Sequence, residues 1–222
     1  MNIVFLGPPG SGKGTQAKGL AEKHKLVHLS TGDLFRDAIA RKTPLGLEIK
    51  SYVDGGQLVP DELVSRVVFD KLNGLGKSQG FLLDGYPRTL DQAKALQNFA
   101  STAGIPIDAV LFFDVAFDEL IKRLSARRQC GSCKEVYNLV NKPPKKAGIC
   151  DKCASPLTHR PDDQPAVVEE RLQVYKRQTE PLLDFYRAMP MFRRVDGAKD
   201  IASVGRQIDA ALQELPAKSG RK

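Results

Sequence analysis

The chain has 222 residues, of which 41% are hydrophobic and 27% are charged, and its formal net charge at pH 7 is +8. A chain of this length can bury one substantial core with one or two smaller excursions, and its ordinary hydrophobic content excludes an intrinsically disordered protein. The positive charge suits a protein that handles polyanions, but charge alone does not distinguish nucleotides from nucleic acid or acidic lipid.

The N-terminal sequence predicts a cytoplasmic protein. Its hydrophobic run at residues 2–6 is shorter than the core of a signal peptide or a membrane span, and it leads directly into a glycine-rich loop. We therefore also expect no membrane partner. Residues 216–222 are basic, and we expect them to form a solvated end without a partner.

The first predicted element is a strand at residues 3–6, followed by the sequence Gly-Pro-Pro-Gly-Ser-Gly-Lys-Gly-Thr at residues 7–15 and a helix that ends near His24. Glycines let the backbone turn tightly, so that successive N–H groups point at one anion, and the helix adds the positive end of its dipole. Lys13 supplies a point charge for the outer phosphates of a nucleotide. A glycine-rich turn with a solvated lysine is the alternative, but the strand, glycine spacing and lysine together favour a phosphate-binding loop.

A small helical excursion is expected after the second strand, at residues 26–29. Residues 30–33 have the capping sequence Ser-Thr-Gly-Asp, which precedes a predicted helix over 34–41. A second helix runs from Pro44 to the Asp-Gly-Gly breaker at 54–56. The chain therefore leaves the sheet between its second and third strands.

A further helix over residues 61–72 leads to a third strand at 81–83, which is followed directly by Asp84. Open α/β sheets bind ligands at the carboxyl ends of their strands, so Asp84 is well placed to hold Mg²⁺ through water. An aspartate that only starts a turn is the more frequent case, but the preceding phosphate loop favours the metal. A helix over 90–99 and a fourth strand at 109–113 continue the alternation.

Six arginines occur where they could clamp phosphate groups, although any one of them alone could be a solvated surface residue. A guanidinium binds phosphate through two parallel N–H bonds. Arg123 and Arg127 are four residues apart and therefore share one face of a predicted helix over 117–127. The other four are Arg36, Arg88, Arg160 and Arg171.

All four cysteines of the chain lie in two Cys-x-x-Cys pairs, Cys130 with Cys133 and Cys150 with Cys153. Pairs at this spacing place four thiolates around one tetrahedral ion, and four sulfur ligands leave no open coordination position. A reducing compartment disfavours disulfides. The sequence therefore predicts a structural zinc site, with free or redox-active thiols as the alternative.

The last part of the chain returns to regular structure after a loop-rich, cysteine-bearing insert. A long amphipathic helix is predicted to end near residue 188, and a strand at 192–195 and a helix over 201–212 follow. The alternation of strands and helices predicts an α/β protein with a parallel sheet and helices on both faces. We expect a core formed by residues 1–29, 60–126 and 164–222, a small excursion at 30–59 and the insert at 127–163.

Four segments of the sequence resemble adenylate kinases: GPPGSGKGTQ, LSTGDLFR, GFLLDGYPRT and RPDDQPAVVEERL, in this order and spacing. The cysteine-rich insert resembles the zinc-binding lid of the long form of that family, and the resemblance covers residues 1 to about 212. It implies the P-loop nucleoside monophosphate kinase fold, with residues 30–59 as the AMP-binding excursion and 127–163 as the lid. It also implies reversible phosphoryl transfer from Mg²⁺-ATP to AMP, giving two ADP.

The resemblance implies two nucleotide sites. For ATP it implies Gly10, Ser11, Gly12, Lys13, Gly14, Thr15, Arg123, Arg127, Val136, Tyr137 and Lys199. For AMP it implies Thr31, Arg36, Gln57, Leu58, Val59, Gly85, Tyr86, Pro87, Arg88, Gln92, Arg160 and Arg171. Gln92 would read the adenine edge of AMP, and Tyr86 stands where phenylalanine is more usual.

Catalysis is implied to rest on positive charges, because phosphoryl transfer between two phosphates depends on positioning and charge neutralisation more than on a base. The residues implied are Lys13, Arg88, Arg127, Arg160 and Arg171. Asp162 and Asp163 resemble the acidic pair that closes the lid. Water would hydrolyse ATP in an open site, so both excursions are expected to close before transfer.

Three other functions compete with this one. A related monophosphate kinase could use GTP as donor or another acceptor. A GTP-dependent switch needs Asp-x-x-Gly and Asn-Lys-x-Asp, and the sequence contains neither. A zinc-ribbon nucleic-acid binder would use the lysines of the insert, whose only aromatic residue, Tyr137, provides little stacking. We therefore expect a monomer whose partners are ATP, AMP and ADP, without nucleic acid.

Overall fold

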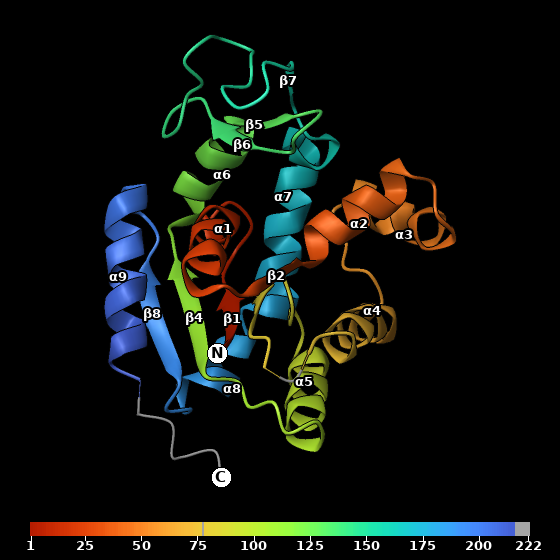
Figure 1. Ribbon diagram of the computed structural model, residues 1–222. Helices are drawn as coiled ribbons and strands as arrows, with labels where there is room; N and C mark the ends of the chain where they lie inside the picture. Colours follow the sequence, from red (N-terminus) through yellow and green to blue (C-terminus); the bar gives the residue numbers. More distant parts are fainter. Residues whose placement is uncertain (77, 216–222) are drawn as a thin grey trace.

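Five parallel strands form the centre of the protein. In the computed structural model, which describes residues 1–76 and 78–215, these strands lie in the order β2-β3-β1-β4-β8 (Figure 1). Their bounds are Asn2–Leu6 (β1), Val27–Ser30 (β2), Phe81–Asp84 (β3), Ala109–Asp114 (β4) and Phe192–Asp196 (β8). The predicted parallel sheet is confirmed. The basic segment 216–222 lies outside the described residues.

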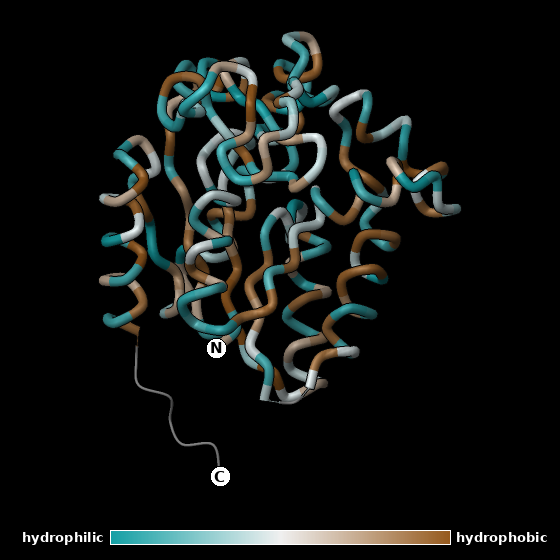
Figure 2. Tube along the Cα trace, turned by 45° about the horizontal axis from the view of Figure 1, so that its top comes forward, coloured by the Kyte–Doolittle hydropathy of each residue, from teal (hydrophilic) through white to brown (hydrophobic). Residues whose placement is uncertain are grey.

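The central strands β1, β3 and β4 are hydrophobic on both faces because helices cover both faces. All five residues of β1 are buried, with Val4 and Leu6 in one hydrophobic cluster and Ile3 and Phe5 in the other. This burial on both sides is typical of parallel sheets. Figure 2 shows hydrophobic stretches along the central strands, whereas helices at the edges alternate hydrophobic and hydrophilic residues.

The helices divide between the two faces of the sheet. One face is covered by α4 (Asp61–Asn73), α5 (Leu90–Thr102) and α8 (Leu182–Arg187), and the other by α1 (Lys13–His24) and α9 (Ile201–Gln213). α6 (Phe117–Ser125) ends two residues earlier than predicted, because Arg127 already belongs to a strand. Within the described part of the chain, no helix has the length and hydrophobicity that crossing a membrane requires.

The long helix predicted to end near residue 188 does end there, but it is interrupted. α7 covers Pro165–Val174, a π-helical turn covers Tyr175–Thr179, and α8 begins at Leu182. Pro181 has no backbone N–H and clashes with the carbonyl of the preceding turn, so a regular helix cannot pass through it. The periodicity was nevertheless informative, because Leu172, Leu182 and Tyr186 are all buried.

The first excursion consists of α2 (Thr31–Ala40) and α3 (Pro44–Asp54), which project to one side of the sheet (Figure 1). α2 begins three residues earlier than predicted, because the Ser30 side chain accepts a hydrogen bond from the Asp33 N–H (3.2 Å) and caps the helix there. The two helices pack closely at Gly46, where a Cβ would lie 2.1 Å from the Ala38 carbonyl oxygen.

The second excursion is a small antiparallel sheet that lies at one end of α6 and α7 (Figure 1). Its strands are β5 (Arg127–Cys130), β6 (Val136–Asn138) and β7 (Leu157–Thr158), in the order β6-β5-β7. Its hydrophobic cluster contains the buried Cys130, Tyr137 and Cys150, with Cys133 and Leu157 packed against them. We call residues 127–163 the cysteine insert.

Candidate functional site

The loop between β1 and α1 has the geometry of a phosphate cradle. Gly10 and Gly12 have φ angles of 86° and 94°, which favour glycine. A Cβ at Gly10 would also lie 2.9 Å from the Leu124 Cγ atom, so a larger residue would not fit there. α1 begins at Lys13 with Gly12 as its N-cap, and the positive end of the helix dipole therefore adjoins the loop.

The Lys13 side chain folds back over this loop. Its Nζ atom donates hydrogen bonds to the carbonyl oxygens of Gly7 (2.7 Å) and Pro8 (2.8 Å). Burial lowers the pKa of Lys13 to about 8; Asp84 opposes this shift, and nearby arginines add to it. A bound anion would favour the protonated lysine, so the loop is suited to phosphate.

Asp84 is the last residue of β3, at the edge of the sheet where the sequence predicts a ligand-binding acid. It lies beside the phosphate loop. It is opposite Phe5 of β1 in the register of the sheet. A Cβ added to Gly14 would lie 3.4 Å from the Asp84 Oδ2 atom, and His28 Nε2 lies 3.6 Å from the same oxygen. The carboxylate is therefore close enough to the loop to act on a ligand held there.

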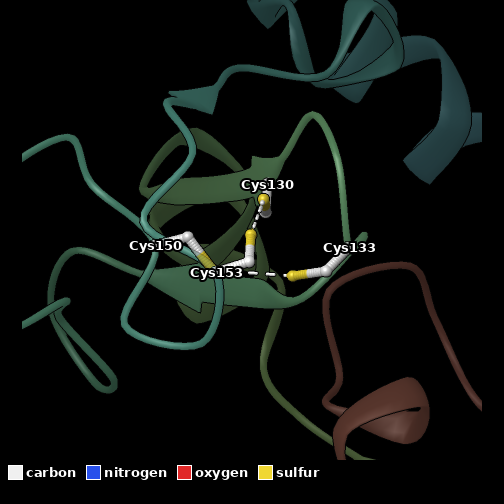
Figure 3. A group of neighbouring side chains, drawn as sticks. All are labelled: Cys130, Cys133, Cys150 and Cys153. Atoms are coloured by element: carbon white, nitrogen blue, oxygen red, sulfur yellow. Dashed lines mark hydrogen bonds between the residues drawn. The ribbon is translucent and has the colours of Figure 1, made fainter.

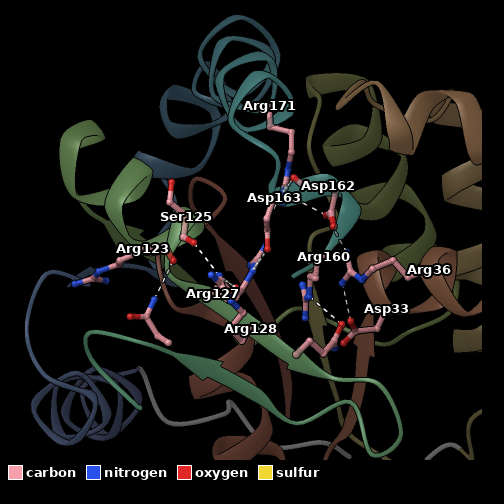
Figure 4. A network of polar contacts seen from close by, with 12 residues as sticks. Asp33, Arg36, Arg123, Ser125, Arg127, Arg128, Arg160, Asp162, Asp163 and Arg171 are labelled. Atoms are coloured by element: carbon pink, nitrogen blue, oxygen red, sulfur yellow. Dashed lines mark hydrogen bonds and ion pairs between the residues drawn. The ribbon is translucent and has the colours of Figure 1, made fainter. Parts of the chain in front are cut away.

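Two carboxylates tie together arginines from different elements (Figure 4). Asp163 is fully buried and accepts hydrogen bonds from Arg127 Nε (2.7 Å) and Arg171 Nη1 (3.1 Å). Asp162 lies 3.2 Å from Arg171 Nη1 and 3.4 Å from Arg36 Nη1. The acidic pair therefore connects the cysteine insert with α7 and with the first excursion.

Positive charge nevertheless dominates this cluster. Burial lowers the pKa of Arg160 to about 9, and repulsion from Arg127 and Arg36 adds to the shift. Burial and repulsion from Arg127 likewise lower the pKa of Arg171 to about 10. Both shifts mean that the protonated arginines are held at a cost in free energy, which a bound anion would reduce.

These groups line a cavity of about 970 Å³. That volume is at the upper end of the range for small-molecule sites. The predicted site residues in its wall are Gly10, Ser11, Gly12, Lys13, Gly14, Thr15, Arg36, Leu58, Asp84, Gly85, Pro87, Arg88, Arg123, Arg127, Val136, Tyr137, Arg160, Arg171 and Lys199. The structure thus gathers all the predicted donor and catalytic residues, which are far apart in the sequence, around one space.

A smaller cavity of about 70 Å³ shares Arg36, Arg88 and other wall residues with the large one. Its predicted site residues are Thr31, Arg36, Gln57, Leu58, Val59, Gly85, Arg88, Gln92 and Arg171. The Thr31 hydroxyl donates a hydrogen bond to the Gly85 carbonyl (2.9 Å), which joins α2 to the end of β3. The predicted AMP residues therefore meet where the first excursion faces the sheet.

Tyr86 is the predicted site residue whose side chain does not line either cavity. It is fully buried in the hydrophobic core, and its hydroxyl lies 2.9 Å from the Ser65 hydroxyl and donates to the Gln92 carbonyl (3.3 Å). The place of Tyr86 in the AMP site therefore stays a prediction, and its side chain packs in the core instead of a cavity wall. Ser65 provides the partner that a buried phenol needs, which explains how tyrosine can replace phenylalanine here.

One end of the large cavity is formed by α6 and the loop between β8 and α9. Arg123 donates hydrogen bonds to Glu119 Oε1 (2.8 Å), to the Gly197 carbonyl (2.7 Å) and to the Ala198 carbonyl (3.2 Å). These bonds hold the guanidinium against the backbone that leads to Lys199. Arg123 and Lys199, which the resemblance groups at the donor base, therefore lie at the same end of the large cavity.

The four cysteine sulfurs converge at the tip of the cysteine insert (Figure 3). All four Sγ atoms lie within 4.8 Å of one another, with separations of 3.4 Å between Cys130 and Cys153 and 3.5 Å between Cys133 and Cys150. Sulfurs around a tetrahedral zinc at about 2.3 Å would be roughly 3.8 Å apart. The sulfur positions therefore fit one metal ion.

Two residues that connect the cysteine insert to the core were not predicted from the sequence. Lys18 of α1 donates to Glu135 Oε2 (2.6 Å), and Lys142 donates to Glu135 Oε1 (2.7 Å). Hydrogen bonds from Lys142 and Lys18 lower the pKa of Glu135 to about 2. No local pattern could have indicated the pair, because Lys18 and Glu135 are 117 residues apart in the chain.

Comparisons with known proteins show the family of the chain. The family model of adenylate kinase matches residues 5–191. The adenylate kinase of Archaeoglobus fulgidus is 47% identical over 215 residues, which cover 97% of this chain and 99% of that protein. The adenylate kinases of Clostridium tetani (47% over 212 residues, 96% and 98%) and Staphylococcus aureus (46% over 215 residues, 97% and 100%) are similarly related. The chain therefore belongs to the adenylate kinase family, the ATP:AMP phosphotransferases.

Proposed function

We propose that this chain carries out the reaction of its family, reversible phosphoryl transfer from Mg²⁺-ATP to AMP, with the phosphates of both nucleotides meeting in the large cavity. The observation that supports this most strongly is the convergence of Lys13, Arg88, Arg127, Arg160 and Arg171 on one space. The cavity extends from the phosphate loop in one direction towards Arg123 and in the other towards the first excursion, so it has room for two nucleotides.

The donor is proposed to bind between the phosphate loop and the cysteine insert. Gly10 to Thr15 would hold its phosphates through backbone N–H groups and Lys13, and Arg127 would contact the same phosphates. Arg123, Val136, Tyr137 and the Lys199 backbone would surround its base. The fixed position of Arg123 against the Gly197 carbonyl supports this arrangement.

The acceptor is proposed to bind between α2, α3 and the end of β3. Arg36 and Arg88 would clamp the AMP phosphate, and Gln92 would contact the adenine. Thr31, Gln57, Leu58, Val59, Gly85 and Pro87 would complete the pocket, and Arg160 and Arg171 would reach the transferred group. The shared walls of the two cavities support this assignment, because they bring the acceptor phosphate towards the donor.

Charge neutralisation would then account for most of the acceleration. The transition state of phosphoryl transfer spreads negative charge over the transferred oxygens, and preorganised cations stabilise it without reorganising. Mg²⁺ bound to ATP would neutralise part of this charge, and Asp84 would hold the ion through water. The lowered pKa values of Lys13, Arg160 and Arg171 support this role, since each cation gains from an approaching anion.

We propose that Cys130, Cys133, Cys150 and Cys153 hold one structural Zn²⁺. Four thiolates would complete its coordination, so the ion would maintain the fold of the insert and leave no position for substrate. The Tyr137 hydroxyl lies 3.4 Å from Cys150 Sγ and accepts a bond from the Asp151 N–H (2.8 Å). Tyr137 would therefore connect the metal site with the donor pocket, whose wall it also forms.

Three regions are proposed to move relative to one another during the reaction: the core (1–29, 60–126 and 164–222), the AMP-binding excursion (30–59) and the lid (127–163). Contacts between them support closure over the substrates, namely Lys18 with Glu135 and Arg36 with Asp162. Because one chain supplies all the walls of both cavities, we propose a monomer. Its free cysteines suit a reducing compartment, and we propose that it acts in the cytoplasm.

The alternatives have less support. The relatives described above are adenylate kinases, and none of these findings favours GTP as donor or a different acceptor. A GTP-dependent switch would have no use for the second cavity, and a nucleic-acid binder would have no use for an enclosed cluster of arginines.

The test is an assay of ADP formation in which ATP and AMP are omitted in turn. We expect strict dependence on both nucleotides, because each site has its own phosphate clamp. Two adenosines joined through five phosphates should inhibit far better than ATP or AMP alone, since this compound spans both sites. Equal consumption of ATP with and without AMP would contradict the proposal.

A further inference from the structure

Asp61 is the first residue of α4, and its carboxylate joins α4 to the start of α5. Its Oδ1 atom accepts a hydrogen bond from Gln92 Nε2 (2.7 Å), and its Oδ2 atom accepts one from the Thr89 hydroxyl. Thr89 in turn caps α5 by accepting a bond from the Gln92 N–H (3.2 Å). These bonds form a closed ring that holds both the backbone and the side chain of Gln92.

The other end of the Gln92 amide is also fixed. Its Oε1 atom accepts a hydrogen bond from the Arg88 backbone N–H (2.7 Å). An N–H group can only donate and an ionised carboxylate can only accept, so the chemistry of the two partners determines which end of the amide is oxygen. Gln92 is 2% exposed. Turning its amide over would place two donors, Nε2 and the Arg88 N–H, against each other, and two acceptors, Oε1 and the Asp61 carboxylate, in the same way. Both unfavourable pairs would be buried away from water.

We propose that Asp61 is a specificity-determining positioning residue, which locks the Gln92 amide in the one orientation that recognises adenine in the acceptor site. The inference rests on the proposed binding of AMP beside Gln92. After the bonds to Asp61 and Arg88, the amide retains one hydrogen on Nε2 and one acceptor position on Oε1. It therefore offers a base one donor and one acceptor in a fixed order.

Adenine matches this order, and 6-oxopurines oppose it. Adenine has an acceptor at N1 and a donor at its 6-amino group, so Nε2 would donate to N1 and Oε1 would accept from the amino group. Hypoxanthine and guanine carry a hydrogen on N1 and an oxygen at position 6, so both pairs would become like with like. A glutamine free to turn over would bind either kind of base, and discrimination therefore depends on Asp61.

The test compares AMP with IMP as acceptors, because hypoxanthine differs from adenine at this edge without the extra 2-amino group of guanine. In Asp61→Asn the new amide can donate or accept, so only the Arg88 N–H still opposes turning the Gln92 amide over, and the second, charge-assisted constraint is lost. We expect the ratio of kcat/KM for AMP to that for IMP to fall about tenfold, as expected from the loss of one charge-assisted constraint. Asp61→Ser leaves room for a water molecule that can donate or accept, and it should also lower this ratio. It replaces Asp61→Asn in the test if that variant folds poorly.

Glu62→Gln is the matched control, because it removes the same charge from the same turn of α4 on an exposed side chain. It should leave the ratio unchanged, and KM for ATP should be unchanged in all three variants. A substitution that only damages the fold would lower kcat/KM for AMP and for IMP by the same factor, so the ratio would not change. An unchanged ratio in Asp61→Asn and Asp61→Ser, or an equal fall in Glu62→Gln, would overturn the inference. A wild-type protein that makes no ADP from ATP and AMP would instead overturn the proposed function.

Discussion

Removing the proposed zinc from the cysteine insert should loosen the insert and leave the core folded. Apart from cysteines, the hydrophobic cluster of this region contains only Tyr137 and Leu157 within the described part of the chain. Two such side chains contribute a few kcal/mol at most, whereas ordering each residue costs on the order of 1 kcal/mol. A structural zinc contributes apparent binding free energy on the order of 10 kcal/mol, so the proposed ion would be the main stabilising contribution to the insert.

The perturbation is the double substitution Cys130→Ala and Cys133→Ala, with Ser132→Ala as a control in the same exposed turn. Elemental analysis should find about one zinc per wild-type chain and less in the double variant. Hydrogen exchange should be faster in residues 127–163 of the variant and unchanged in β1 and β4, which belong to the sheet. The control should keep both its zinc and its protection.

Activity separates a structural metal from a catalytic one. The double variant should melt at a lower temperature and still make ADP when assayed cool, with a higher KM for ATP because Arg127, Val136 and Tyr137 lose their fixed positions. Absence of metal from the wild-type protein would leave the thiols for redox chemistry. A variant that keeps the wild-type melting temperature but has no activity would indicate that the ion is catalytic. Each of these two results would refute the reasoning.

The remaining predictions concern the large cavity. Lys13→Met and Arg88→Ala should each lower kcat by on the order of 100-fold or more with little change in melting temperature, because each removes a positive charge that the transition state needs; near-normal turnover would place the site elsewhere. Asp84→Ala should mainly weaken the dependence of the rate on Mg²⁺ concentration, and an unchanged dependence would argue against it as a metal residue. Because Lys13 has a pKa of about 8 and must be protonated to bind phosphate, kcat/KM for ATP should fall about tenfold per pH unit above that value; a profile that stays flat to about pH 9.5 would contradict this role.

The sequence alone was enough for the features that depend on local chemistry. The phosphate loop could be predicted because its glycines, Lys13 and the preceding strand are contiguous and act through their own backbone. The cysteine site could be predicted because the ligand spacing within each pair determines how two thiolates meet one ion. The parallel sheet followed from the alternation of buried strands and amphipathic helices, which depends on periodicity.

Only the tertiary structure decided the features that depend on residues far apart in the chain. It placed the Tyr86 side chain in the core beside Ser65 and paired Lys18 with Glu135. It also placed the Asp61 carboxylate against the Gln92 amide. Hydrogen bonds and ion pairs require groups within about 3 Å of each other. Sequence patterns describe how each segment is built but not which segments the fold brings into contact.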